Sequence, residues 1–94
     1  MNDRNKRNIV AELLRRYGKS IDVSEGENFA AVHKALEKLD YEQRVVVDRF
    51  YIKPVPNPEI KCQWELYMSR ATVYRVLSKA LNIIYEEMKR CEND

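Results

Sequence analysis

Apolar side chains recur every three or four positions from residue 73 to residue 88, and this spacing is the strongest constraint on the fold. The residues are Val73, Val76, Leu77, Ala80, Leu81, Ile84 and Met88. They share one face of an α-helix for more than four turns. We therefore predict a long helix that opens at Ser69 and reaches about Lys89.

The same spacing predicts helices over about residues 4–17, 24–39, 40–52 and 58–66. The only β-branched run, residues 45–47, lies inside a helical pattern and gives little evidence for a strand. The predicted fold class is all-α, with about five helices and no β-wing.

Several residues carry signals for helix ends. Gly18 is expected to stop the first helix, since glycine adopts the left-handed conformation that often ends helices. Three prolines in residues 54–58 break the chain, and Asn57 before Pro58 is expected to cap the next helix with its side chain. Capping boxes are predicted at Ser24 with Glu27 and at Asp40 with Gln43.

The composition excludes several kinds of site. The chain has 94 residues with one histidine, two cysteines and two glycines. His33 is expected to face solvent, and the cysteines lack the paired spacing of a zinc site. No glycine-rich phosphate loop or nucleophile signature is present. We expect a cytoplasmic protein that is not an enzyme and has no cofactor, metal site or membrane segment.

The net charge of +2 is unevenly distributed. Residues 1–20 form a basic N-terminal helix with a net charge of +4, and residues 21–43 carry −4. From Leu66 to Tyr85 the sequence has no acidic residue. A helix without carboxylates approaches phosphates without like-charge repulsion.

The helix over residues 58–66, the turn at residues 67–69 and the helix from Arg70 have the form of a helix-turn-helix. In that motif the first turns of the second helix enter the major groove. Arginine matches the two acceptors of guanine, small side chains permit close approach, and lysine suits phosphates. The predicted DNA-binding residues are Ser69, Arg70, Ala71, Thr72, Tyr74, Arg75, Ser78 and Lys79.

Residues 69–81, SRATVYRVLSKAL, resemble the second helix of the motif in region 4 of sigma factors, and residues 39–51 resemble the helix that opens that domain. Residues 13–17 are reminiscent of small phage late-gene regulators of the ArpU/RinA type. This resemblance implies a region-4-like domain over residues 24–94 that follows the basic helix, within one compact domain overall.

The sequence departs from this family at three positions. Tyr67 stands where the turn usually has glycine, which predicts a strained or different turn. Cys62 and Gln63 stand where the family usually has a branched aliphatic residue and an alanine, and Cys62 is expected in the core. Trp64 is expected to pack between helices, with contact to a partner protein as the alternative.

The resemblance implies a sequence-specific DNA-binding transcriptional regulator of phage or prophage origin that activates late genes. Its main partner is then double-stranded DNA. Because one motif contacts few base pairs, binding to RNA polymerase or to a second copy of the protein is also expected. Two alternatives stay open at this point. One is a module that binds RNA polymerase or a sigma factor without reading DNA, and the other is the recognition subunit of a DNA-packaging terminase.

Overall fold

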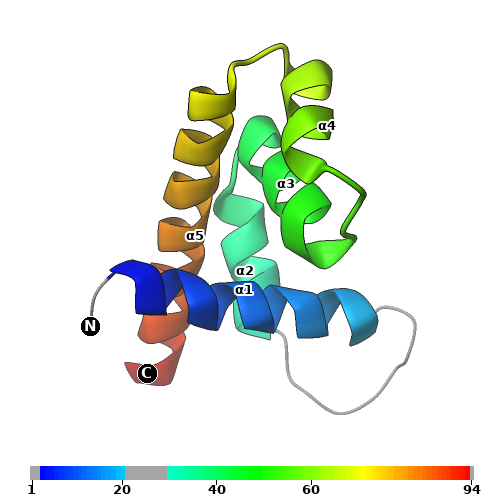
Figure 1. The fold of residues 1–94 in the computed structure, drawn as a ribbon. Coiled ribbons are helices and arrows are strands. Elements are labelled where there is room, and N and C mark those ends of the chain that lie inside the picture. The colour runs from blue at the N-terminus through cyan, green and yellow to red at the C-terminus, as the bar shows by residue number, and fades with distance from the viewer. Residues whose placement is uncertain (1–2, 21–29, 94) are drawn as a thin grey trace.

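The computed structural model describes residues 3–20 and 30–93, and this part of the chain is all-helical with five α-helices and no strand. The helices are α1 (Asp3–Ser20), α2 (Ala30–Lys38), α3 (Tyr41–Val47), α4 (Pro58–Leu66) and α5 (Arg70–Asn93). One π-helical turn, η1 (Asp48–Ile52), extends α3. Figure 1 shows α5 along one side of the molecule and α1 crossing its lower half. The predicted all-α fold is confirmed.

The core forms where the apolar faces of the five helices meet. Fourteen buried residues make one cluster: Val10, Leu14, Val32, Ala35, Leu36, Leu39, Val46, Val47, Cys62, Val73, Leu77, Ala80, Leu81 and Ile84. Both α1 and α4 contribute to this cluster, so the basic N-terminal helix packs onto the rest of the fold. The prediction that Cys62 is a core residue is confirmed, and burial raises the pKa of its thiol.

The prediction that Gly18 stops the first helix is wrong, since α1 continues to Ser20. Gly18 lies instead against the backbone of η1. A Cβ atom added to Gly18 would be 1.9 Å from the carbonyl oxygen of Ile52 and 2.8 Å from its carbonyl carbon. Glycine is therefore needed here for close approach between two backbones, not for a left-handed conformation.

The predicted capping box at the start of α3 is confirmed. The Gln43 backbone N–H donates to Asp40 Oδ1 at 2.8 Å, and the Asp40 N–H donates to Gln43 Oε1 at 3.0 Å. The end of this helix differs from the expected regular helix over residues 40–52. The last turn is π-helical, since the Lys53 N–H donates to the Asp48 carbonyl five positions earlier, and Pro54 follows directly after it.

The start of α4 corrects a further expectation. Pro58 occupies the first turn as predicted, but Asn57 makes no capping hydrogen bond with its side chain. Asn57 is in the left-handed region with φ of 50°, where a capping residue would normally be extended. Its backbone carbonyl accepts the N–H of Lys61 at 3.1 Å.

The predicted capping box of Ser24 with Glu27 lies outside the described residues. From Ala30 onward, α2 presents Val32, Ala35 and Leu36 to the core as predicted. His33 is exposed, as predicted, and its Nδ1 lies 3.5 Å from the Tyr17 hydroxyl.

One ion pair fixes α2 to α5. Lys38 donates from Nζ to Glu87 Oε2 at 2.7 Å, and Glu87 is only 7% exposed. This hydrogen bond lowers the pKa of the Glu87 carboxyl below its ordinary value. The contact is therefore worth most when Glu87 is ionised.

We predict that this pair makes stability depend on pH in the acidic range. Because the pKa is lower in the folded than in the unfolded chain, the pair stabilises the fold above the ordinary carboxyl pKa. That stabilisation is lost as the pH falls through the folded-state value. Urea unfolding between about pH 5 and pH 3 should show a steeper loss of stability for the wild type than for Glu87→Gln. Equal slopes would contradict the assignment.

Candidate nucleic-acid interface

A three-residue turn joins α4 to α5 at the top of the molecule in Figure 1. Tyr67 ends α4 in the left-handed conformation, with φ of 52° and ψ of 49°, and its N–H donates to the Gln63 carbonyl. Ser69 then begins α5, since its Oγ accepts the Thr72 N–H at 3.2 Å. The turn thus forms at the predicted residues, and Tyr67 adopts the backbone conformation that glycine normally supplies.

The structure brings all eight predicted DNA-binding residues together, with Ser69 as the cap of α5 and the other seven on its first three turns. Thr72 and Ser78 are half-buried, and the other six are exposed: Ser69, Arg70, Ala71, Tyr74, Arg75 and Lys79. The apolar side chains of the same turns point into the core, so this exposed face is the side that α5 leaves to solvent.

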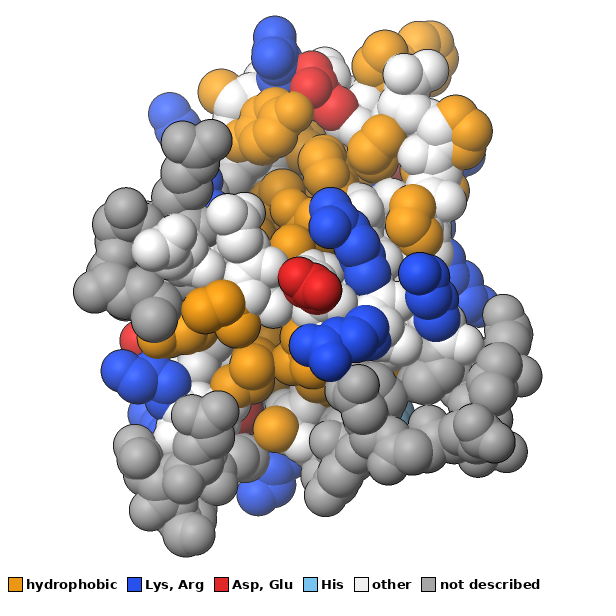
Figure 2. Space-filling model, turned by 60° about the horizontal axis from the view of Figure 1, so that its bottom comes forward, with side chains coloured by type: hydrophobic (Ala, Val, Ile, Leu, Met, Phe, Trp, Pro, Cys, Tyr) orange, Lys and Arg blue, Asp and Glu red, His pale blue; other side chains and the backbone are white. Residues whose placement is uncertain are grey.

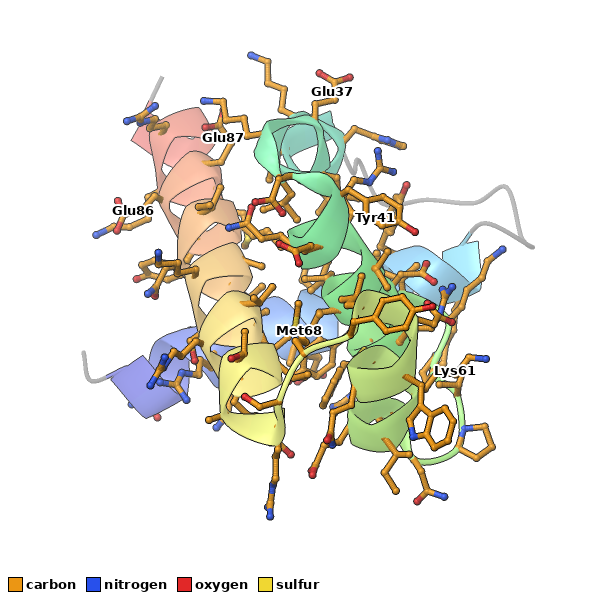
Figure 3. All side chains as sticks on the ribbon, turned by 90° about the horizontal axis from the view of Figure 1, so that it is seen from above. Glu37, Tyr41, Lys61, Met68, Glu86 and Glu87 are labelled. Carbon is orange, nitrogen blue, oxygen red and sulfur yellow. The ribbon has the colours of Figure 1, made fainter. Side chains whose placement is uncertain are left out.

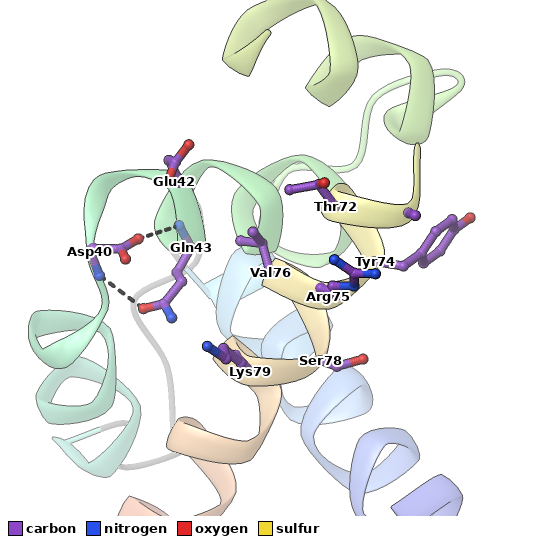
Figure 4. Close-up of a pocket in the computed structure, with 10 residues that line it drawn as sticks. Asp40, Glu42, Gln43, Thr72, Tyr74, Arg75, Val76, Ser78 and Lys79 are labelled. Carbon is purple, nitrogen blue, oxygen red and sulfur yellow. Dashed lines mark hydrogen bonds between the residues drawn. The ribbon is translucent and has the colours of Figure 1, made fainter. Parts of the chain in front are cut away.

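An open hollow of about 620 Å³ lies along this face, between the start of α3 and α5. Figure 4 shows its two walls. The α3 wall contains Asp40, Glu42 and Gln43, and the α5 wall contains Ala71, Thr72, Tyr74, Arg75, Val76, Ser78 and Lys79. Acidic groups therefore face basic groups across the hollow.

Arg75 and Lys79 are the cations of this face that remain available. Both are exposed, and no hydrogen bond or ion pair to another residue in the described part of the chain holds either of them. Asp40, on the opposite wall of the hollow, uses one carboxylate oxygen to cap α3. Two unpaired cations one helical turn apart are suited to bind phosphates or the acceptor edge of a guanine.

Arg70 is held by a residue that sequence reasoning missed. Glu59, in the first turn of α4, accepts a bond from Arg70 Nε to Oε1 at 2.9 Å and one from the Tyr74 hydroxyl to Oε2 at 2.7 Å. The hydrogen bond to Glu59 raises the pKa of Tyr74. The sequence has no acidic residue from 66 to 85, but in the structure the Glu59 carboxylate of α4 contacts the first turns of α5.

Tyr74 is further positioned by its ring contacts. Its ring meets that of Phe50 edge to face with centroids 6.1 Å apart, and the Arg70 guanidinium lies 5.9 Å from its centroid. At 41% exposure, Tyr74 is partly packed and partly available. These contacts hold the Tyr74 ring close to Arg70, so that only part of the ring is available to a ligand.

The prediction that Trp64 packs between helices is wrong. Trp64 is 77% exposed, and on the same side of α4 Ile60 is 53% and Tyr67 94% exposed. The helix buries Cys62 instead, which lies about half a turn away from Trp64 on the helical wheel. Within residues 58–66 the sequence pattern supports either face, since apolar residues occur on both.

A second basic surface lies on α1. Its exposed cations are Arg7, Arg15, Arg16 and Lys19, and Glu12 is exposed among them. Figure 2, which brings the lower side of the molecule forward, shows Lys and Arg side chains gathered around one acidic side chain. Arg15 also stacks on Tyr51, with its guanidinium 5.5 Å from the ring centroid.

Across residues 3–20 and 30–93, no group of three or more His, Cys, Asp or Glu side chains is arranged to hold a metal ion. In the same residues no helix combines the length and apolar character needed to cross a membrane. Comparisons of the chain with protein-family models, curated proteins and solved structures give no match.

Proposed function

We propose that this protein is a sequence-specific DNA-binding transcriptional regulator that uses α4, the turn and α5 as a helix-turn-helix. The observation that carries the proposal is the exposed face of α5, where Arg75 and Lys79 stand unpaired beside the small residue Ala71. The resemblance of residues 69–81 to region 4 of sigma factors supports the same function. It further favours a phage or prophage late-gene activator that works in the bacterial cytoplasm together with RNA polymerase.

In this mechanism the contacts divide between phosphates and bases. Arg75 donates two parallel hydrogen bonds to the acceptors of a guanine, and Ala71 lets the α5 backbone approach the groove. Lys79, one turn further along, binds a phosphate as a compact charge. Arg70 is neutralised by Glu59, so its contribution is smaller than that of Arg75.

The experiment that tests the proposal is the salt dependence of duplex binding. We predict that Lys79→Ala weakens binding to every duplex alike and flattens the slope of log affinity against log salt by about 1. The measurement is fluorescence anisotropy with one labelled duplex at several salt concentrations. Lys34→Ala, which removes an exposed lysine on α2, is the matched control and should leave the slope unchanged. Equal slopes for wild type and Lys79→Ala would contradict the proposal.

A second variant tests the role of Glu59. Glu59→Gln removes the negative charge beside Arg70, so we predict tighter binding to non-specific duplex, by about two- to tenfold at low salt. The salt slope should steepen, because Arg70 becomes free to meet a phosphate. Glu37→Gln removes an equal charge from α2, far from the first turns of α5 (Figure 3), and should have little effect. Unchanged or weaker binding by Glu59→Gln would show that DNA does not approach Arg70.

One observation favours a protein-interaction role as the second candidate. Ile60, Trp64 and Tyr67 expose apolar surface that the fold does not use. A module that binds RNA polymerase or a sigma factor would need such a surface. In that case the Lys79→Ala and Arg75→Ala variants would keep the parent affinity for DNA.

A further inference from the structure

A surface hollow of about 430 Å³ lies where the end of α1 meets the end of η1, and its lining is basic. The lining residues are Arg15, Gly18, Lys19, Tyr51, Ile52, Lys53 and Pro54. Three of them are cations, and none is acidic. The hollow shares no lining residue with the one between α3 and α5. We call it the α1–η1 hollow, and it lies outside the helix-turn-helix.

Gly18 brings the cations of the α1–η1 hollow together. A Cβ atom added to Gly18 would be 1.9 Å from the Ile52 carbonyl oxygen, so the backbones of α1 and η1 are almost in contact. Lys53 follows Ile52 directly, while Arg15 and Lys19 line the hollow from the α1 side. Arg15 and Lys19 are also four positions apart, a spacing at which like charges on a helix repel. The fold therefore gathers three positive charges that a bound anion would stabilise.

These three cations have no carboxylate partner in the part of the chain that the structure describes. Arg15, Lys19 and Lys53 are exposed, and no ion pair within residues 3–20 and 30–93 includes any of them. Glu12 is exposed about one turn before Arg15, but it does not line the hollow. The Arg15 guanidinium lies 5.5 Å from the centroid of the Tyr51 ring. Stacking of this kind leaves the N–H groups at the edge of the guanidinium free to donate to an anion.

Tyr51 adds a neutral hydrogen-bond donor to the same lining. Burial raises the pKa of its hydroxyl, and the positive charges of Arg15 and Arg7 only partly oppose that rise. The phenol therefore keeps its proton at neutral pH. Its hydroxyl makes no hydrogen bond to another residue of the described ranges, so the O–H is available to an acceptor.

We propose that the α1–η1 hollow binds the backbone phosphates of a second DNA segment, so that one molecule holds two duplexes. A guanidinium offers paired donors to a phosphate, and two lysines add compact positive charges. The phosphate contact goes beyond the proposed function, because it needs no base reading by α5. The holding of two duplexes rests on the proposed function, because α5 then binds the first one.

The basic surface is longer than a site for a small phosphate compound needs. Arg7 is exposed about two turns before Arg15, and Lys19 is exposed about one turn after it. The row from Arg7 to Lys19 covers about 18 Å along the helix axis. A duplex carries about one charge per 1.7 Å of its axis, so a surface of this length lies near several phosphates. The apolar side of α1 is buried through Val10 and Leu14, which leaves no amphipathic face for a lipid surface.

The position of the hollow assigns it to a second segment of DNA. In Figure 1, α5 runs along the left side of the molecule, and its apolar residues pack inward. The contact between the end of α1 and η1 lies on the right side of the same view. The exposed face of α5 and the α1–η1 hollow are therefore on different sides of the molecule, with the core between them. A straight duplex on one of them does not cover the other.

Charge removal tests the phosphate contact separately from α5. In the Arg75→Ala/Lys79→Ala background, duplex binding at low salt should persist, because the hollow still attracts phosphates. Adding Lys19→Gln and Lys53→Gln should then flatten the slope of log affinity against log salt by about 2, as measured by fluorescence anisotropy. Lys34→Gln in the same background removes an exposed lysine of α2 and should leave the slope unchanged. An unaltered slope in the combined variant, or loss of all duplex binding in the background alone, would overturn the proposal.

The two proposals fail separately in this experiment. If Arg75→Ala/Lys79→Ala binds DNA like the wild type while Lys19→Gln/Lys53→Gln binds more weakly, the α5 mechanism is wrong and the phosphate contact stands. Circular dichroism should show the same helix content for Lys19→Gln/Lys53→Gln as for the wild type, because both side chains are exposed and unpaired.

Inorganic phosphate distinguishes a DNA-binding surface from a site for a small phosphate compound. At constant ionic strength, replacing chloride with about 10 mM phosphate should leave duplex binding nearly unchanged, because many phosphates of the duplex act together. Displacement of the duplex by micromolar phosphate, absent in Lys19→Gln/Lys53→Gln, would overturn the assignment to DNA.

A capture assay tests whether one molecule holds two duplexes. One duplex is fixed to beads, the protein is added, and retention of a second, fluorescent duplex is measured. The wild type should retain the second duplex, and Lys19→Gln/Lys53→Gln should retain at least about fivefold less while still binding the beads. Equal retention by this variant would show that another surface, or a second copy of the protein, holds the second duplex, and the proposal would be wrong.

Discussion

Replacing Gly18 with alanine is expected to destabilise the fold by about 2–4 kcal/mol. The same substitution in an ordinary helix interior stabilises a protein by up to about 1 kcal/mol, because alanine is the better helix former. In α1 the added Cβ would be 1.9 Å from the Ile52 carbonyl oxygen. The Cβ is fixed rigidly to the α1 backbone and the Ile52 carbonyl belongs to the η1 backbone, so relief requires that α1 and η1 move apart.

Urea unfolding followed by circular dichroism measures this effect. Asn8→Ala is the matched control, because it adds alanine at an exposed position of the same helix and should be neutral or slightly stabilising. We expect the free energy of unfolding to fall for Gly18→Ala and to stay equal or rise slightly for Asn8→Ala. If Gly18→Ala is as stable as the wild type, then α1 does not pack on η1 as described.

The second large effect is expected from Arg75→Ala. Removing a guanidinium that reads a guanine weakens binding to the preferred site by about 1–3 kcal/mol, or roughly 5- to 150-fold. It should also relax the preference at one base pair. Competition binding with the preferred duplex and with single-base variants of it measures both effects.

Arg70→Ala is the matched comparison for Arg75→Ala. Both arginines are exposed on the first two turns of α5, but Arg70 is already paired with Glu59 while Arg75 is not. Arg70→Ala should therefore reduce the affinity for the preferred duplex less than Arg75→Ala does. If Arg75→Ala weakens all sequences equally, Arg75 binds a phosphate and does not read a base.

The fold could be predicted largely because its helices are defined by local signals. The spacing of residues 73–88 places Val73, Leu77 and Ile84 in the core, as found. The Asp40–Gln43 capping box and the cap at Ser69 depend on residues three positions apart. Such signals involve residues only a few positions apart, so they can be recognised in the sequence alone.

The errors concern residues whose role depends on distant parts of the chain. Gly18 was expected to end a helix, but its function is set by Ile52 on another element. Trp64 is predicted to pack between helices, but α4 turns its Cys62 side to the core and leaves Trp64 77% exposed on the opposite side. Neither outcome follows from spacing alone.

In the candidate site, too, local features could be predicted and contacts from distant parts of the chain could not. The eight candidate residues are predicted from the helix-turn-helix form of residues 58–79, and the structure brings them together at the start of α5. Glu59 was missed because counting charges along the sequence does not detect a carboxylate eleven positions away on a neighbouring helix. Its contact with Arg70 and Tyr74 changes the expected order of importance, so that Arg75 ranks above Arg70.

Selection of bound sequences from random duplex DNA tests the central claim most directly. The protein is incubated with the random pool at about 0.1 M salt, and bound duplexes are recovered and sequenced over several rounds. We predict enrichment of a short motif that contains a guanine, with the preference at that guanine lost when Arg75→Ala is used. Recovered sequences that match the input pool would contradict sequence-specific binding and favour the interaction module.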